Sequence, residues 1–289
     1  MEIWTFTEGY FHDEKPGMAV EIGEYTWRNI KAEEVSYILS GDGSRRVMYR
    51  GKETEPPVFF TIQDYSNVTF PVARHLEEMG SVNITGSEAI RISRSKMEAY
   101  ECMVSAGVPC AKTIAVTKDV TAELLIEELS LPFVMKPDSG FGGRDVVLVK
   151  SKEEVEKELS EIKEDSPLIL AQKFVATSKG RDLRVITIGE TAAIGVLRQA
   201  GDENEFRSNL MLGGKASRYE LDDSTKELAV SAAKAVGLGF SGVDLLFADN
   251  GFVVGEINPS PGINQDFKIN VMFPEMKKYA EKVIKEKSK

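Results

Sequence analysis

Apolar positions along this chain fall into short runs, and most runs are bounded by glycine, proline or polar turn residues. Runs of this length, alternating or continuous, predict β-strands. Several follow one another with only a short turn between them, which is typical of antiparallel pairs. The predicted strands are 113–117, 132–137, 145–150, LILAQKFV, DLRVITIG, TAAIGVLRQ, 243–247 and the run that begins at 251.

Helical patterns lie between these strands. Ser93 is placed to cap a helix with apolar and small residues at helical spacing, and Gly107 follows at its C′ position. Ser151 and Glu154 form the pattern of a capping box for a second helix that continues to about 165. Further helices are predicted from about 224 to 237 and from about 274 onward.

The pattern indicates an α+β fold, in which helices cover one side of antiparallel strand pairs, rather than a parallel dinucleotide-binding sheet. Residues 1–92 mix short apolar runs with turn clusters and indicate a small α/β unit. A chain of 289 residues suits two or three small domains that share clefts. We expect domains at 1–92, 93–171 and 172–289.

Charge and composition narrow the classes of function. The net charge of −10 argues against unaided binding to nucleic acid or to an anionic membrane. With two His and two Cys, a zinc site would need all four residues together, and a disulfide framework is excluded. No apolar run reaches the ~18 residues of a membrane span, and the acidic N-terminus is unlike a signal peptide. We expect a cytoplasmic protein with reduced thiols.

The last two predicted strands carry a candidate metal site. Glu256 and Asn258 are two residues apart, so strand alternation points them to one face, with Asp244 arriving from the neighbouring strand. Two carboxylates and a carboxamide are the oxygen donors that Mg²⁺ prefers, especially when substrate phosphates complete its octahedron. The alternative is an ordinary hairpin with solvated acids.

A glycine-rich turn follows Lys136 in the segment PFVMKPDSGFGGRDV. Glycines let backbone N–H groups wrap phosphate oxygens, and a nearby lysine adds positive charge. The segment is not a Walker A loop, because no G-K-[ST] follows and a strand comes next. The alternative is a flexible hairpin loop. GLGFSG at 237–242 matches G-x-G-x-x-G, but a strand follows where the dinucleotide fingerprint needs a helix, so we reject it.

Two further segments are candidates for nucleotide contact. LILAQKFVATSKGRDLRV reads as strand, short connection, strand, and such a connection can hold an adenine ring while Asp182 reaches a ribose hydroxyl. The alternative for Asp182 is a salt bridge with Arg181 or Arg184. NEFRSNLMLGGKA contains Arg207, whose planar guanidinium suits bidentate contact with phosphate or carboxylate, followed by small polar residues and glycines.

In this order, the segments resemble the ATP-grasp superfamily and, within it, the ligases similar to ribosomal protein S6 modification protein, the glutamate ligases. The matching segments are SRSKMEAYECMVSAGVP, PFVMKPDSGFGGRDV, AQKFV with GRDLRV, FRSNLMLGG, and GVDLLF with GEINPSPG. The resemblance implies two α+β modules that clasp ATP, preceded by a small N-terminal domain. Residues 93–171 would be the central subdomain with the glycine-rich lid, and 172–289 the C-terminal subdomain with the magnesium site.

The resemblance also implies roles for individual residues. Lys136 and Arg207 are implied to be catalytic, through fixed positive charge. The nucleotide is implied to contact Lys96, Lys136, Ser139, Gly142, Gly143, Lys173, Phe174, Asp182, Arg207, Ser208 and Asn209, and magnesium to contact Asp244, Glu256 and Asn258. The chain departs from the family at Lys173, where an acid is common. It also departs at Met211 and Leu212, where a polar, basic pair is common, which leaves the amino-acid substrate open.

The implied activity is ATP-dependent ligation of a carboxylate to an amine. An acyl phosphate would form first, an amide second, and ADP and phosphate would leave. ATP and one or two Mg²⁺ ions, with Mn²⁺ as a substitute, are the implied cofactors, and the substrates are small molecules or peptides, with glutamate or another amino acid as the amine. Homo-oligomers are common in the family.

Three alternatives remain open at this point. A peptide-modifying ligase could form side-chain amide or ester links with the same ATP site. A phosphotransferase would use the same lysines and magnesium ligands but release a stable phosphate ester. A non-enzymatic nucleotide-binding module would bind the nucleotide and form neither product.

Overall fold

The computed structural model describes residues 2–6, 19–22, 25–62, 66–140, 145–163, 166–202, 205–208, 213–262 and 271–287. The chain forms two compact units. The first contains residues 1–90, 237–241 and 259–289, and the second contains 91–236 and 242–258. The division into 1–92, 93–171 and 172–289 stays a prediction. Several residues singled out in the sequence lie outside the described residues, namely Gly142, Gly143, Asn209, Met211 and Leu212.

The first unit contains a five-stranded sheet of order β2-β3-β1-β7-β8, in which β1 pairs in parallel with β3 and β7. Aromatic side chains of β1 and β7 form its core, because Trp4, Phe6, Phe59 and Phe60 are fully buried. A three-stranded antiparallel sheet, β4-β5-β6, belongs to the same unit. The parallel strands, with helices in the same region, agree with the α/β character predicted for residues 1–92.

The helices and strands of this unit have the following bounds. They are β1 (Glu2–Phe6), β2 (Ala19–Ile22), β3 (Tyr25–Ile30), η1 (Ala32–Glu34), β4 (Val35–Leu39), β5 (Arg45–Tyr49), β6 (Lys52–Thr54), β7 (Phe59–Ile62), α1 (Thr69–Glu78), β8 (Val82–Asn83) and α8 (Phe273–Lys287). Helix α2 (Ser87–Ser93) spans the sequence boundary between the two units.

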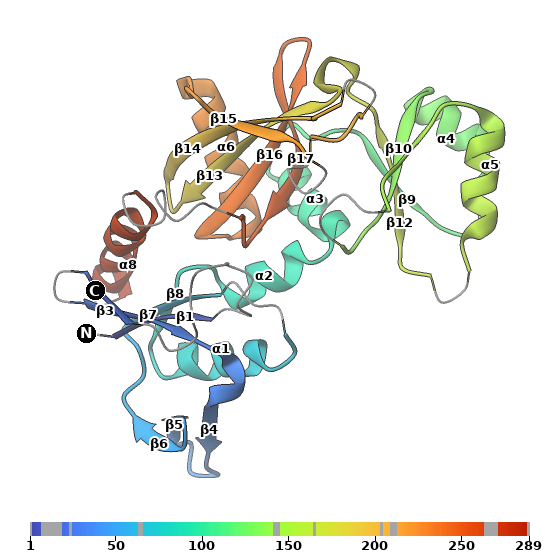
Figure 1. Cartoon of the computed structure of the whole chain (residues 1–289). Coiled ribbons are helices and arrows are strands. Elements are labelled where there is room, and N and C mark those ends of the chain that lie inside the picture. The colour runs from blue at the N-terminus through green and yellow to red at the C-terminus, as the bar shows by residue number, and fades with distance from the viewer. Residues whose placement is uncertain are drawn as a thin grey trace. The chain divides into compact units, whose positions relative to one another are not determined.

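The second unit begins with α3 (Lys96–Ser105) and a four-stranded antiparallel sheet of order β11-β10-β12-β9. Helices α4 and α5 lie on the same side of this sheet (Figure 1) and close a core around Leu125, Phe133 and Val155. The elements are β9 (Thr113–Val116), α4 (Ala122–Leu129), β10 (Phe133–Pro137), β11 (Val147–Val149), α5 (Lys152–Glu161) and β12 (Ile169–Lys173).

A five-stranded sheet of order β15-β14-β13-β16-β17 completes the second unit, and α6 packs against it. The elements are η2 (Ala176–Ser178), β13 (Arg181–Ile188), β14 (Thr191–Gln199), β15 (Lys215–Tyr219), α6 (Asp223–Val236), β16 (Phe240–Ala248) and β17 (Gly251–Asn258). Helices with antiparallel strands confirm the predicted α+β class. Strand β16 begins at Phe240, within GLGFSG, and no helix follows there, which agrees with the rejection of a dinucleotide fingerprint.

The outer edge of β17 is covered by the segment 109–111, where Cys110 forms an isolated parallel bridge with Val254. The N–H of Ala111 donates to the carbonyl of Val254 at 3.1 Å, and the N–H of Val254 donates to the carbonyl of Pro109 at 2.8 Å. Both backbone groups of Val254 are therefore satisfied at this edge.

The start of α3 differs from the sequence prediction. Ser93 ends α2, and Ser95 is the N-cap, with its Oγ accepting a hydrogen bond from the N–H of Glu98 at 3.0 Å. The pattern Ser-x-Ser offers two caps, and the short turn after α2 selects the second. Gly107 stands after α3 with φ +75°, as expected for a C′ glycine.

Among the described residues, no helix combines the length and the apolar character needed to cross a bilayer.

Candidate functional site

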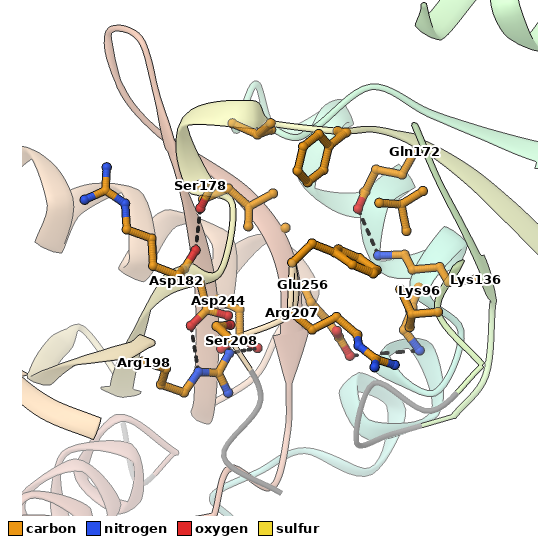
Figure 2. A pocket seen from close by; sticks show the side chains of 18 of the residues that line it. Lys96, Lys136, Gln172, Ser178, Asp182, Arg198, Arg207, Ser208, Asp244 and Glu256 are labelled. Carbon is orange, nitrogen blue, oxygen red and sulfur yellow. Dashed lines mark hydrogen bonds and ion pairs between the residues drawn. The ribbon is translucent and has the colours of Figure 1, made fainter. Parts of the chain in front are cut away.

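A cavity of about 240 Å³ opens in the second unit, between side chains from α3, β10, β12, β13, β14, β16 and β17. Figure 2 shows Lys96 and Lys136 on one side and Asp182, Arg198 and Asp244 on the other. The residues predicted from sequence that line the cavity are Lys96, Lys136, Lys173, Phe174, Asp182, Arg207, Ser208, Asp244, Glu256 and Asn258. Ser139 is described but does not line it.

A β-bulge at Gly255 determines which side chains of β17 face Asp244. Asp244 opposes Glu256, whereas the next residue on β16, Leu245, opposes Val254, so Gly255 is the extra residue. Directly opposed residues of antiparallel strands share a face. Without the bulge, Asp244 would oppose Gly255 and Glu256 would project from the other face. The bulge therefore brings the two carboxylates to one side of the sheet.

The same register brings the amide of Asn258 to this face, where its Nδ2 donates to Oδ2 of Asp244 at 3.3 Å. The bulge also explains the glycine at position 255. A Cβ there would lie 2.8 Å from Cγ of Leu246, closer than packed carbon atoms approach. A glycine inside an otherwise apolar strand is compatible with a bulge but does not by itself predict one.

Two arginines hold the carboxylate of Asp244. Arg184 donates from Nε to Oδ1 and from Nη2 to Oδ2, each at 2.7 Å, and Nη2 of Arg198 lies 2.9 Å from Oδ2. Arg198 also pairs with Asp182, from Nε to Oδ1 at 2.7 Å. Burial opposes ionisation of Asp244, but the charges of Arg184 and Arg198 outweigh it and lower the pKa of Asp244.

The pairing of Asp182 differs from both sequence alternatives, Arg181 and Arg184. Its partner is Arg198, which stands directly opposite Asp182 on β14. Arg184 turns to Asp244 instead, and the guanidinium of Arg181 donates to the carbonyl of Thr177. The salt-bridge interpretation was right about the type of partner and wrong about its identity, because the strand register was not readable from sequence.

The two lysines reach the cavity from different elements. Nζ of Lys96, at the start of α3, donates to the carbonyls of Asp138 and Gly140 at 3.1 and 3.0 Å and lies 3.9 Å from Oε1 of Glu256. Burial lowers the pKa of Lys96, against the opposing charge of Glu256. Lys136, on β10, is 8% exposed, and burial lowers its pKa despite nearby carboxylates.

Aromatic residues form an apolar wall of the cavity. Phe174 follows β12 and meets Phe206 edge-on, with ring centroids 6.3 Å apart. The guanidinium carbon of Arg207 lies 5.6 Å from the centroid of the Phe206 ring, and Arg207 also pairs with Glu205 at 2.8 Å. Aromatic side chains that line a cavity suit the binding of a planar ring.

The lining residues that sequence reasoning did not assign to the site include Gln172, Arg184, Arg198 and Phe206. Asp182 and Arg184 are two apart on β13, so alternation puts both on the face that Asp244 shares. That spacing was visible in the sequence, whereas the position of Arg198 opposite Asp182 depends on long-range pairing.

The comparisons with known proteins agree with this architecture. The sequence matches the RimK-like ATP-grasp domain over residues 93–276. It is 38% identical over 232 residues to a probable alpha-L-glutamate ligase of Legionella pneumophila (strain Corby), covering 78% of this chain and 76% of that protein. A protein of the same name from Picosynechococcus sp. is 35% identical over 223 residues, with 75% and 73% covered.

Two solved structures share the fold. The ATP-grasp ligase PsnB, complexed with a phosphomimetic variant of a minimal precursor, Mg and ADP, superposes with a TM-score of 0.70 at 16% identity, with 98% of each chain covered. D-alanine–D-alanine ligase from Bacillus anthracis gives a TM-score of 0.69 at 16% identity, with 99% of each chain covered. The fold, the family match and the named relatives together show that this chain belongs to the RimK-like ATP-grasp family and is an ATP-grasp ligase.

Proposed function

We propose that this chain joins a carboxylate to an amine through an acyl phosphate, releasing ADP and phosphate. The observation that carries the proposal is the meeting of two sets of groups in one cavity. Oxygen donors from Asp244, Glu256 and Asn258 lie on one strand pair, and the ammonium groups of Lys96 and Lys136 enter from the opposite side. Phosphoryl transfer needs both, because negative charge spreads over the phosphate oxygens as the bond breaks.

The donor set fits magnesium. Among the residues that the structure describes, no group of three or more His, Cys, Asp and Glu side chains is arranged to hold a metal by itself. Two carboxylates with one amide leave positions for phosphate oxygens and water, which is how Mg²⁺ is usually bound. The chemistry that the ion would supply when bound is positive charge against the negative charge that develops on the phosphates. Asp244, Glu256 and Asn258 would hold it.

The remaining residues position and stabilise the nucleotide. The wall formed by Phe174 and Phe206 would hold the adenine ring, with the backbone after Lys173 reading its edge. Lys136 would hold a phosphate, and Arg207, beside Ser208, would stabilise the acyl phosphate. No protein nucleophile is required, because the substrate carboxylate itself attacks the γ-phosphate and the amine then displaces phosphate.

The relatives named probable alpha-L-glutamate ligases make L-glutamate the first amine to test. Met211 and Leu212, where the sequence departs from the family pattern, lie outside the described residues. The absence of nucleic-acid and membrane partners stays a prediction from the net charge of −10.

The test measures products from Mg²⁺-ATP with pooled amino acids, peptides and small carboxylates. We expect ADP and phosphate to appear only with substrate, together with a condensed product by mass. Glu256→Ala should form no product. Glu220→Ala, which changes an exposed glutamate of the same unit, should keep full activity. AMP and pyrophosphate would overturn the acyl-phosphate route, and a stable phosphate ester would identify a phosphotransferase.

A further inference from the structure

The hydroxyl of Tyr100 is buried between α3, β10, β12 and β17, and the residue is 3% exposed. Three groups surround it: Nε2 of Gln172 at 2.7 Å, Nζ of Lys136 at 3.3 Å and the carbonyl of Gly255. The amide Nε2 and the ammonium can only donate, and the carbonyl can only accept. The O–H of Tyr100 is therefore directed at Gly255, and its oxygen accepts from Gln172 and Lys136.

This network gives Lys136 neutral partners. Its ammonium donates to Oε1 of Gln172 at 3.0 Å and to the hydroxyl of Tyr100, which leaves a third N–H for the cavity that Lys136 lines. Figure 2 shows Gln172 above Lys136 with this bond drawn. Neutral oxygens orient the ammonium without cancelling its charge, whereas a carboxylate partner would compete with a phosphate for it.

The orientation of Gln172 is fixed from its other end. Its Nε2 also donates to Oγ1 of Thr113 on β9, at 2.9 Å. Both N–H bonds of the amide are used, so Oε1 must face Lys136.

The hydrogen bond from Tyr100 to the carbonyl of Gly255 connects this network to the β-bulge. Gly255 is the extra residue of β17, so its carbonyl lies outside the regular ladder with β16, and Tyr100 donates to it. An unpaired buried carbonyl would favour a shift of register. The next residue is Glu256, whose place beside Asp244 depends on the bulge.

We propose that Tyr100 is a positioning residue, whose single hydroxyl both orients the ammonium of Lys136 and holds the bulge that turns Glu256 toward Asp244. It links the phosphate side of the cavity to the strand that carries the predicted magnesium ligands. The proposal rests on the proposed function, because it assumes that Lys136 and Glu256 bind Mg²⁺-nucleotide.

The test is Tyr100→Phe, which keeps the ring and removes the hydroxyl. We measure the affinity for Mg²⁺-ADP by calorimetry as a function of pH and of Mg²⁺ concentration. Loss of one hydrogen bond to a charged group predicts about tenfold weaker binding. The alkaline loss of affinity should also start at lower pH, since the ammonium has lost an acceptor that stabilises its charged form. A higher Mg²⁺ concentration should be needed, since the bulge is no longer held.

A second variant, Gln172→Glu, predicts the opposite pH shift. A carboxylate in place of the neutral oxygen raises the pKa of Lys136, so the alkaline limb moves to higher pH, while the affinity for ADP falls because the charge is compensated. Tyr49→Phe is the matched control. It removes a phenol that bonds Glu34 at 3.4 Å in the other unit, and it should leave all three readouts unchanged.

The outcomes separate the two proposals. If the wild-type protein does not bind Mg²⁺-ADP, the proposed function fails. If it does, and Tyr100→Phe binds with the same affinity, pH limb and Mg²⁺ requirement, the positioning role is wrong. A uniform loss of affinity, with a lower melting temperature and no movement of the pH limb, would show a packing role and also overturn the proposal.

Discussion

Arg184 and Asp244 face each other from neighbouring strands, β13 and β16, with both nitrogen–oxygen distances at 2.7 Å. A bidentate pair of this geometry is among the strong hydrogen-bonded contacts in proteins. In the described structure the carboxylate that we assign to magnesium is thus already held by an arginine. Binding of a cation to Asp244 has to compete with that guanidinium.

Arg184→Met should therefore strengthen divalent-cation binding in the absence of nucleotide. Removing one hydrogen-bonded charge pair predicts about a tenfold gain in affinity, limited because Arg198 still contacts Asp244. Mn²⁺ binding, followed by electron paramagnetic resonance, measures this directly. Arg184→Lys keeps the charge, so its Mn²⁺ affinity should lie between those of the wild type and Arg184→Met. Equal affinities in all three proteins would show that Arg184 does not compete with the cation for the carboxylate.

Glu256→Ala should abolish turnover and leave the fold intact. The side chain is 30% exposed and its ion pair with Lys96 is long, at 3.9 Å, so little packing is lost. We expect turnover to fall at least about a hundredfold, and the free energy of unfolding to change by less than about 1 kcal/mol. Steady-state assays and urea unfolding report the two quantities. Normal turnover at saturating Mg²⁺ would contradict the assignment of Glu256 to the metal.

Nucleotide affinity should fall as pH rises into the alkaline range. The fall should begin at a lower pH than the one at which an exposed lysine loses its charge. Burial lowers the pKa of Lys136, so its ammonium is present below that lowered value and is lost as pH rises through it. Calorimetric titration with Mg²⁺-ADP across this pH range measures the fall in affinity. In Lys136→Met, binding should be weak at every pH, and the part of the alkaline fall in affinity that is due to this lysine should vanish. A limb unaltered by that substitution would remove Lys136 from the phosphate site.

Gly255→Ala should impair the site more than the fold. The added Cβ would lie 2.8 Å from Cγ of Leu246, which also lines the cavity, so the bulge or that side chain must move. Overpacking of this kind costs about 1–3 kcal/mol of stability, and Mg²⁺-ADP affinity should drop as well.

Gly41→Ala is the matched control, since a Cβ at Gly41 meets no atom within 4 Å. Thermal unfolding and calorimetry on both variants test the prediction. Wild-type affinity in Gly255→Ala would show that the exact register of β17 is not required for binding.

Much of the fold was predictable because it is local. The positions of the strands, the start of the helix after Ser151 and the glycine after α3 follow from periodicity and capping, and the structure confirms them. Element ends were less predictable, since β11 and α5 are shorter than expected and β16 is longer. Alternation also predicted correctly that Glu256 and Asn258 share a face. These features depend on residues within a few positions of one another.

What could not be predicted depends on pairing between distant segments. The bulge at Gly255 arises only when β17 meets β16, and Arg198 finds Asp182 only through the register of β13 with β14. The buried bond from Tyr100 to Gly255 joins residues 155 apart in sequence. A helix pattern marks Tyr100 as inward-facing and says nothing about what its hydroxyl meets.

The covered edge of β17 limits how a peptide could be recognised. At Val254, one edge of β17 faces β16 and the other is paired with residues 109–111. The carbonyl of the next residue, Gly255, accepts a hydrogen bond from Tyr100. Strand addition, in which a peptide extends an open sheet edge, has no free backbone to use at this point. A peptide substrate reaching Glu256 would be selected by its side chains and its reacting terminus rather than by main-chain pairing along this strand.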